Sequence, residues 1–248
     1  MKTQIIDCQN MGYSGLTGKK LKDKYTLGKC IDSGNFGEIF EIEGGLVAKV
    51  SEDSESLANE IKIIKTLAKN RARYVTTLID YDIVVINNFL NDKRTTCGYL
   101  IMPKYLRTHS CPLDTGRQLL RSLEFLHNIG RVHNDIKPEN VMSSKNGSTV
   151  LIDFGMSEKY TDQDQDSVFQ GNLLFASLDK LNFKKTTRKD DLVSLAYMMM
   201  FLTCNHEMPY SQEFMKNEDN SCNDPRANLD LIKRYKEKHS LKEMAKKT

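Results

Sequence analysis

The octapeptide HNDIKPEN, residues 133–140, concentrates side chains that can do chemistry. Asp135 can accept a proton from a hydroxyl, and Lys137 can offset negative charge on a phosphoryl group in transfer. Asp153 follows in the sequence IDFG, 18 residues after Asp135. Together with Asn140 it supplies oxygen ligands of the kind that Mg²⁺ prefers, with water and phosphate completing the octahedron. This pattern predicts metal-dependent phosphoryl transfer.

A glycine-containing stretch, DSGNFG at residues 32–37, precedes these groups. Glycines in a turn between strands let the backbone approach a phosphate without a Cβ in the way. Lys49 follows in the apolar run LVAKV, where a lysine is rarely buried without a partner. Glu60 is the candidate partner, and the pair would then hold the α- and β-phosphates of a nucleotide. Each feature alone is equally compatible with a plain hairpin or a structural ion pair.

The elements that must position these groups divide the chain into a β-rich part and a helical part. Residues 25–50 predict three strands, with the pair Gly44-Gly45 as a hairpin connection. Residues 51–70 predict a helix that begins after Ser and Asp capping candidates. Its expected apolar stripe, with Glu60 at the border, consists of Leu57, Ile61, Ile64 and Ala68. Two further strands, at 74–86 and 97–102, would complete a five-stranded antiparallel sheet that carries one helix.

Helical periodicity dominates from Pro112 onward. Leu119, Leu123 and Leu126 share one helical face, and Gly130 is a plausible end signal. Two short strands follow, at 140–144 and 148–154, and residues 190–202 are apolar nearly all round, which indicates a buried helix. A last helix beginning at Pro225 would face Leu229 and Ile232 inward. We expect a loose extension over 1–23 and one domain over 24–248, with an N-lobe at 24–103 and a C-lobe at 104–248.

Bulk composition favours a soluble globular protein. The 248 residues are 39% hydrophobic and 28% charged, and the net charge of +3 is too small to indicate nucleic-acid binding. The six cysteines contain no CxxC pair. Residues 1–11 lack the apolar centre of a signal peptide, and the longest apolar run, 11 residues from Leu192, is shorter than the ~20 that a membrane span needs. We therefore expect an intracellular monomer, cytoplasmic or nuclear, that does not bind membranes.

The glycine-rich loop, strand lysine, helix glutamate, HxDxxxxN loop and DFG motif, in this order, resemble the signature set of protein kinases. The resemblance covers about residues 24–210. The segments DFGMSEKY, FASLDKL and RKDDLVSLAYMMMFL are similar to those of the casein kinase I group, including its vaccinia-related branch. This implies an α+β, bilobal protein kinase fold, with a five-stranded antiparallel β N-lobe carrying one helix and a mainly α C-lobe.

The resemblance also implies roles for individual residues. The catalytic set would be Asp135, Lys137, Lys49 and Glu60, with Asn140 and Asp153 binding Mg²⁺. ATP would contact Lys49 and the loop residues Asp32, Ser33, Gly34, Asn35, Phe36 and Gly37. Met102 would be the gatekeeper, and the adenine hinge would run from Pro103 to Leu106 and include Tyr105. Asp191 would tie down the backbone of the catalytic loop.

Several positions depart from the family pattern. Asp32 occupies the first glycine position of the loop, and we expect its carboxylate to face solvent. Asn134 replaces the arginine that in many kinases gathers a phosphorylated activation loop, which predicts activity independent of such phosphorylation. Leu174 stands where casein kinase I has an arginine for primed substrates, and Asn172 replaces a threonine expected to contact the catalytic loop.

Three functions are compatible with this sequence. The first is a Ser/Thr protein kinase that uses Mg²⁺-ATP, because Lys137 two residues after Asp135 fits Ser/Thr specificity in the family. The second is a pseudokinase that acts as a nucleotide-binding or regulatory module, which Asp32, Asn134 and Asn172 favour. The third is a small-molecule phosphotransferase. The intact catalytic set favours the first, with a protein as the phosphate acceptor.

Overall fold

The computed structural model describes residues 3–8, 13–34, 37–88, 93–107, 111–160, 166–204, 206–208, 210 and 225–246. The chain divides into two compact units. Unit 1 comprises Met1–Leu106 together with Asp153–Gly155, and unit 2 comprises Arg107–Ile152 and Met156–Thr248. None of the described helices is long and apolar enough to cross a membrane.

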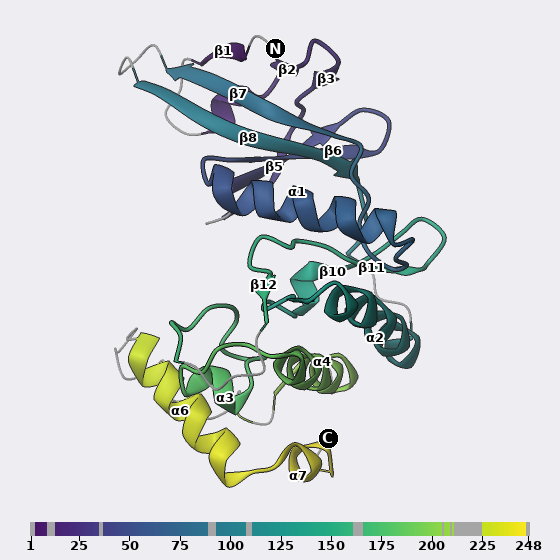
Figure 1. Ribbon diagram of the computed structural model, residues 1–248, viewed down its shortest axis with the longest axis vertical. Coiled ribbons are helices and arrows are strands. Elements are labelled where there is room, and N and C mark those ends of the chain that lie inside the picture. Colours follow the sequence, from purple (N-terminus) through teal and green to yellow (C-terminus); the bar gives the residue numbers. More distant parts are fainter. Residues whose placement is uncertain are drawn as a thin grey trace. The chain divides into compact units, whose positions relative to one another are not determined.

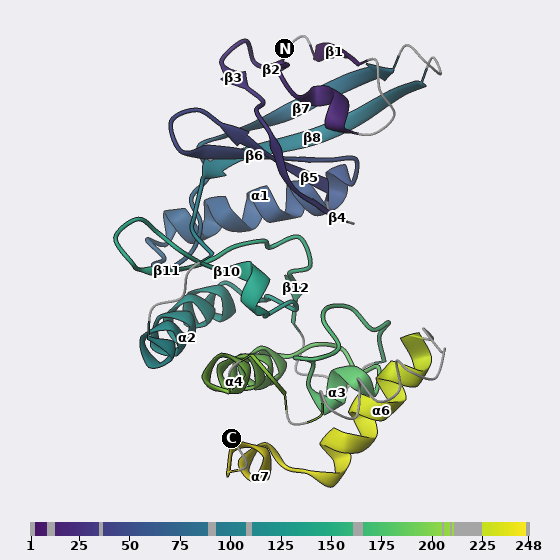
Figure 2. The ribbon, with the colours of Figure 1, turned by 180° about the vertical axis from the view of Figure 1, so that it is seen from behind.

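Unit 1 is built on a six-stranded sheet in the order β1-β7-β8-β6-β5-β4 (Figures 1 and 2). Its strands are β1 (Gln4–Cys8), β4 (Cys30–Gly34), β5 (Gly37–Ile42), β6 (Leu46–Ser51), β7 (Asp80–Asn88) and β8 (Lys93–Pro103). The five expected strands are β4 to β8, and all their pairings are antiparallel. The expected hairpin is confirmed, because Gly44 and Gly45 join β5 to β6 at positive φ. The sixth strand, β1, was not expected, and it pairs with β7 in parallel.

The described part of the N-terminal segment is not a loose extension, in contrast to the expectation for residues 1–23. Ile6 of β1, Leu16 of the 3-10 turn η1 (Tyr13–Leu16) and Leu21 of the β2–β3 hairpin are buried in one core cluster of the sheet. The hairpin strands are β2 (Lys20–Leu21) and β3 (Tyr25–Thr26). These few apolar residues are scattered among polar ones without a period, so pattern analysis does not reveal them.

Helix α1 (Ser54–Lys69) packs on the other face of the sheet. Ile101 and Leu100 are successive residues of β8, so their side chains point to opposite faces, and they belong to two different core clusters. Leu57 of α1 shares the cluster of Leu100 and approaches β8 so closely that a Cβ on Gly98 would lie 2.6 Å from its Cδ2. The N-terminal segment therefore covers one face and α1 the other.

The buried face of α1 differs from the expected stripe. Its buried residues are Leu57, Glu60, Ile63, Ile64 and Leu67. Ile61 is half-buried and Ala68 is exposed, so the prediction is right for Leu57 and Ile64 and wrong for Ala68. The face that meets the sheet is rotated toward Ile63 and Leu67, which places Glu60 inside the buried face instead of at its border.

Unit 2 is mainly helical. Its helices are α2 (Pro112–Asn128), α3 (Leu178–Leu181), α4 (Arg188–Thr203), α6 (Pro225–Lys238) and α7 (Leu241–Lys246). Short antiparallel pairs join β9 (Arg131–Val132) to β12 (Glu158–Lys159) and β10 (Val141–Ser143) to β11 (Thr149–Leu151). A 3-10 turn, η2 (Pro138–Asn140), precedes β10. The chain thus has an α+β fold, with a sheet-based unit and a helical unit.

The packing of the unit 2 helices follows the sequence pattern in part. Leu119, Leu123 and Leu126 are buried on one face of α2 as predicted, and Gly130 ends the helix at φ +75°. Helix α4 is less completely buried than expected, because Leu192 is 44% exposed. Its buried face instead includes two acidic residues in its first turn, Asp190 and Asp191. In α6, Ile232 is fully buried and Leu229 half-buried.

Candidate active site

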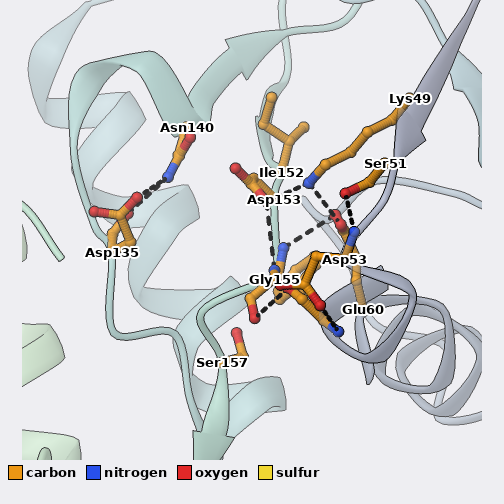
Figure 3. Close-up of polar contacts among 12 residues, drawn as sticks. Lys49, Ser51, Asp53, Glu60, Asp135, Asn140, Ile152, Asp153, Gly155 and Ser157 are labelled. Atoms are coloured by element: carbon orange, nitrogen blue, oxygen red, sulfur yellow. Dashed lines mark hydrogen bonds and ion pairs between the residues drawn. The ribbon is translucent and has the colours of Figure 1, made fainter. Parts of the chain in front are cut away.

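The strand lysine of unit 1 lies between two carboxylates (Figure 3). Lys49 is on β6, opposite Ile39 on one side and Leu100 on the other, so its side chain starts from the middle of the sheet. Its Nζ lies 2.8 Å from Oε2 of Glu60 and 2.7 Å from Oδ1 of Asp153. The sequence had paired Lys49 with Glu60, and the structure adds Asp153 as a second partner.

The electrostatics of this cluster keep the lysine charged. Burial opposes the charge on Lys49, but the carboxylates of Glu60 and Asp153 outweigh that effect and raise the pKa of Lys49 above its ordinary value. Glu60 is buried more completely than either partner, at 1% side-chain exposure. A cation held in this way retains full charge at neutral pH and can bind a phosphate oxygen.

The backbone at the DFG motif is fixed by the same residues. Oε1 of Glu60 accepts a hydrogen bond from the backbone N–H of Phe154 at 3.1 Å, so Glu60 uses both of its oxygens. Asp153 adopts φ +61°, a conformation that a non-glycine residue rarely takes. The carbonyl of Gly155 accepts a hydrogen bond from Ser56 Oγ of α1 at 3.1 Å. Glu60 and Ser56 thus hold the two residues that follow Asp153, while Lys49 binds the Asp153 carboxylate itself.

The described part of the glycine-rich loop forms the turn ends of β4 and β5. Gly37 has φ +110°, and a Cβ there would lie 2.1 Å from the carbonyl oxygen of Val50, so only glycine fits. A Cβ on Gly34 would meet nothing within 4 Å, which leaves that side of the backbone open to a ligand. Asp32 and Ser33 are exposed, in agreement with the expected solvent-facing carboxylate. Asn35 and Phe36, also predicted to contact nucleotide, lie outside the described residues.

The predicted hinge follows the end of β8. Met102 is buried, and its sulfur accepts a hydrogen bond from Thr76 Oγ1 at 3.6 Å. Pro103 is the last residue of β8. The hydroxyl of Tyr105 lies 3.3 Å from Thr76 Oγ1, so the tyrosine ring is tied back onto unit 1. The same hydroxyl accepts the backbone N–H of Thr77 at 3.4 Å, so the position of Tyr105 is fixed by residues of its own unit.

The catalytic loop of unit 2, residues 133–140, surrounds Asp135, which is only 4% exposed. Its Oδ2 accepts a hydrogen bond from Nδ2 of Asn140 at 2.9 Å and lies 2.7 Å from Nζ of Lys137. Its Oδ1 is buried and has no hydrogen-bond partner. A buried carboxylate oxygen left without a donor costs free energy. The loop therefore presents one acceptor atom that an incoming hydroxyl would satisfy.

Helix α4 holds the backbone of this loop through Asp191. Its Oδ2 accepts the backbone N–H of His133 at 2.8 Å, and its Oδ1 accepts that of Asn134 at 3.0 Å. The predicted role of Asp191 is confirmed. His127 of α2 contacts the same carboxylate through Nε2 at 2.9 Å. The loop is thus anchored to α4 at the two residues just before Asp135, and α2 supports the anchoring carboxylate.

Asn134 has a structural role that the sequence did not reveal. It adopts φ +71°, and asparagine is among the non-glycine residues that most readily take this conformation. Its Oδ1 accepts hydrogen bonds from Nζ of Lys180 and Oγ1 of Thr186, each at 2.6 Å. The arginine expected here is replaced by an acceptor with two buried donors. No spacing rule predicts this contact, because Lys180 is 46 residues away.

The two predicted metal ligands, Asn140 of unit 2 and Asp153 of unit 1, each carry an oxygen of a type that Mg²⁺ binds. Nδ2 of Asn140 donates to both the backbone oxygen and Oδ2 of Asp135, so its own amide oxygen is left as an acceptor. The side chain of Asp153 is 24% exposed. Within the described part of the chain, no group of three or more His, Cys, Asp or Glu could hold a metal by itself. Mg²⁺ usually takes few protein oxygens and completes its ligand shell with water and phosphate, so the chemistry of each of these side chains is compatible with the predicted role.

A model of the protein kinase domain matches residues 29–247. The chain therefore belongs to the protein kinase family. This match extends beyond the motifs to most of both units, and the order of the glycine-rich loop, Lys49, the catalytic loop and Asp153 is that of the family.

Two relatives place the chain more narrowly. A probable casein kinase I homolog of Encephalitozoon cuniculi is 28% identical over 199 residues, which cover 72% of this chain and 62% of the relative. A probable serine/threonine-protein kinase of Dictyostelium discoideum is 27% identical over 217 residues, 77% of this chain and 43% of the relative. The chain thus spans less than two thirds of the length of either relative. Within the family, the chain is similar to a protein described as a probable casein kinase I homolog.

Proposed function

We propose that the chain is a Ser/Thr protein kinase that transfers the γ-phosphate of Mg²⁺-ATP to protein hydroxyls. The observation that carries this proposal is Oδ1 of Asp135, a buried acceptor with no hydrogen-bond partner. A serine or threonine hydroxyl would satisfy it. The two relatives, a probable casein kinase I homolog and a probable serine/threonine-protein kinase, support the choice of acceptor.

The reaction assigns one task to each residue. Oδ1 of Asp135 accepts the hydroxyl proton while the hydroxyl oxygen bonds to the γ-phosphorus and the bond to the β–γ bridging oxygen breaks. Lys137, whose Nζ already lies 2.7 Å from Asp135, offsets charge on the group in transfer. Lys49 binds the α- and β-phosphates. Bound Mg²⁺ neutralises triphosphate charge, and Asn140 and Asp153 are the residues that would hold it.

The catalytic set needs no phosphorylated residue to complete it. The contacts that fix Asp135 come from Asn140, Lys137 and the loop backbone, which Asp191 anchors. Asn134 offers no cation to a phosphate, because its amide is neutral, and its Oδ1 already accepts hydrogen bonds from Lys180 and Thr186. We therefore propose activity that is independent of activation-loop phosphorylation. Purified protein should keep its activity after phosphatase treatment, and a large loss would contradict this part of the proposal.

The test of the main proposal is radiolabel transfer from ATP to casein, comparing the native chain with Asp135→Asn. Asparagine keeps the shape of the side chain but cannot take the proton, so we expect a loss of roughly 10²- to 10⁴-fold. Asp114→Asn is the matched control, because Asp114 is an exposed residue of α2 whose carboxylate pairs with Arg117 at the surface. Transfer that survives Asp135→Asn would overturn the assigned role. Binding of ATP without transfer by the native chain would indicate a pseudokinase.

A further inference from the structure

We infer that Lys180 is a positioning residue, which locks the catalytic loop to the segment that follows the DFG motif and does so without any phosphate. This inference rests on the proposed function, because it concerns the regulation of the same site. The segment between Met156 and Thr187 is called the activation segment. Lys180 lies within it, on the short helix α3.

The contacts of Lys180 are directed at the catalytic loop. Its Nζ donates to the backbone oxygen of Asn134 at 2.7 Å and to the side-chain Oδ1 of the same residue at 2.6 Å. Thr186, also in the activation segment, donates to the same Oδ1 at 2.6 Å. All three residues are buried. Two parts of the activation segment thus converge on the residue that immediately precedes Asp135.

A third part of the segment closes over this contact. Gly171 has φ +100°, and a Cβ there would lie 2.5 Å from the backbone oxygen of Asn134 and 3.0 Å from Nζ of Lys180. The ring of Phe169 lies 6.0 Å from the same Nζ, at the outer limit of a cation–π contact. Gly171 is therefore the residue that lets the chain pass directly over the lysine. Residues 169–171 of the activation segment therefore pack against Nζ of Lys180.

The environment of Lys180 shows why this contact is structural. No described carboxylate is ion-paired with it, and its partners are an amide oxygen and a carbonyl. Burial lowers the pKa of Lys180, while the more distant charges of Asp191, Asp135 and Asp190 oppose the effect. Burial of the ammonium costs free energy, and the hydrogen bonds to the two oxygens of Asn134 offset this cost only while the segment and the loop keep this arrangement. The geometry favours one fixed position of the segment.

In the usual kinase switch, the positive charge and its partner come from the opposite segments. There the catalytic loop supplies an arginine and the activation segment supplies a phosphate, so the contact forms only after modification. Here the segment supplies the cation, Lys180, and the loop supplies the acceptor, Asn134. The contact is present in the unmodified chain. Asn134 accepts the hydrogen bond that Lys180 donates, which an arginine at this position could not do. The asparagine is therefore needed for this contact between the loop and the activation segment.

The effect on chemistry follows from chain connectivity. Asn134 is bonded covalently to Asp135, so a shift at Asn134 moves the carboxylate that must accept the proton. A displacement of about 1 Å at a reacting group can lower the rate by about 100-fold. Lys180 touches neither Asp135 nor, in the proposed reaction, the nucleotide. Loss of Lys180 should therefore lower kcat and leave KM for ATP nearly unchanged.

The experiment compares Lys180→Met with Lys189→Met in the full chain. Lys189 is the control because it follows in the same stretch of chain but is exposed and pairs with Asp179 at the surface. We expect Lys180→Met to lower kcat by roughly 10- to 100-fold with KM for ATP changed less than about 2-fold. Hydrogen exchange should become faster in residues 131–137 and 167–176 and stay unchanged in α2. Lys189→Met should change neither quantity.

The other possible outcomes either contradict the inference or show that the proposed function fails independently of it. Unchanged kcat and unchanged exchange in both stretches would overturn it. If α2 also loses protection, the variant is unfolded, and Thr186→Val then provides the test, because it removes one donor to Asn134 and keeps the lysine. Thr186→Val with native exchange in both stretches would overturn the inference. If the native chain transfers no phosphate, the proposed function fails, and the exchange data still decide whether Lys180 fixes the loop.

Discussion

Two buried lysines, Lys49 in unit 1 and Lys236 in unit 2, have opposite surroundings. Lys49 is ion-paired with two carboxylates. Lys236, on α6, donates to the backbone oxygens of Leu174 at 2.9 Å and Ala176 at 2.7 Å, and its Nζ lies 4.0 Å from the centre of the Tyr197 ring. The pKa of Lys49 is raised, whereas burial lowers the pKa of Lys236 to about 7.

This difference in surroundings distinguishes a lysine suited to phosphate binding from lysines with a structural role. Lys49 keeps its charge because carboxylates surround it, and a phosphate can compete with them for the same cation. Lys236 is surrounded by two backbone carbonyls and an aromatic ring, without an ion-paired carboxylate. Its burial therefore disfavours the charged form of the amine, and its hydrogen bonds to the carbonyls hold the chain in place. Lys180 belongs with Lys236, since its two partners are also uncharged oxygens. In unit 2, buried lysines determine where the activation segment lies.

Substitution of Lys49 should have the largest effect, and it tests whether the ion-paired lysine is needed for phosphate transfer. Lys49→Met removes the cation that Glu60 and Asp153 share, so we expect phosphate transfer to fall by about 100-fold or more. It also leaves two carboxylates unpaired, which should lower the free energy of unfolding by about 3 kcal/mol at pH 8. Kinetics with casein and urea unfolding would measure the two effects.

The same measurements on Lys65→Met provide the control, because Lys65 lies at the surface of α1 over the ring of Tyr81. The loss of stability in Lys49→Met should shrink at pH 5, since protonation of the freed carboxylates removes their repulsion. A variant with full transfer activity would show that Lys49 is only structural.

Substitution of Lys236 tests the other side of this contrast, through the pH dependence of the free energy of unfolding. The pKa of Lys236 is about 7 in the folded chain against 10.5 ordinarily, so the unfolded chain binds more protons between these values and stability rises with pH through this window. We expect native stability to gain relative to Lys236→Met by up to about 1.4 kcal/mol per pH unit above pH 7. Tyr197 stays neutral there, because burial raises its pKa to about 12.

Urea unfolding of both proteins at pH 6, 7, 8 and 9 would give this difference directly. Below pH 7 the difference should be flat, because Lys236 is then protonated in both states. A difference that stays constant from pH 6 to 9 would mean that the lysine keeps its proton, as Lys49 does, and the contrast between the two lysines would fail.

The smallest expected effect concerns the helix that delivers Glu60 to Lys49. Asp53 caps α1, with Oδ1 accepting the backbone N–H of Ser56 at 2.9 Å. Asp53→Ala should lower the free energy of unfolding by about 1 kcal/mol, and Asp53→Asn should lower it much less, because asparagine is an equally good cap. A larger loss of transfer activity than of stability in Asp53→Ala would show that the cap also positions Glu60.

The sequence predicted the parts of the site that depend on local order. The strands around Lys49, the helix bearing Glu60 and the loop with Asp135 follow from short-range patterns, and Asp191 follows from the family resemblance. Lys180 and Lys236 could not be predicted, because each bonds to a backbone oxygen 46 or 62 residues away and lies in a polar stretch typical of a solvated surface. The same holds for β1, whose partner strand is about 80 residues distant.

The pairing of β1 with β7 has a practical consequence for anyone who trims this kinase. Removing residues 1–23 as a dispensable tail would leave the part of β7 that pairs with β1, from Val84 to Asn88, as an open sheet edge with unpaired N–H and C=O groups. It would also uncover the core side of the sheet that Leu16 and Leu21 now protect. A shortened recombinant chain would then be prone to edge-to-edge aggregation, and its poor yield could be mistaken for an intrinsic defect of the enzyme.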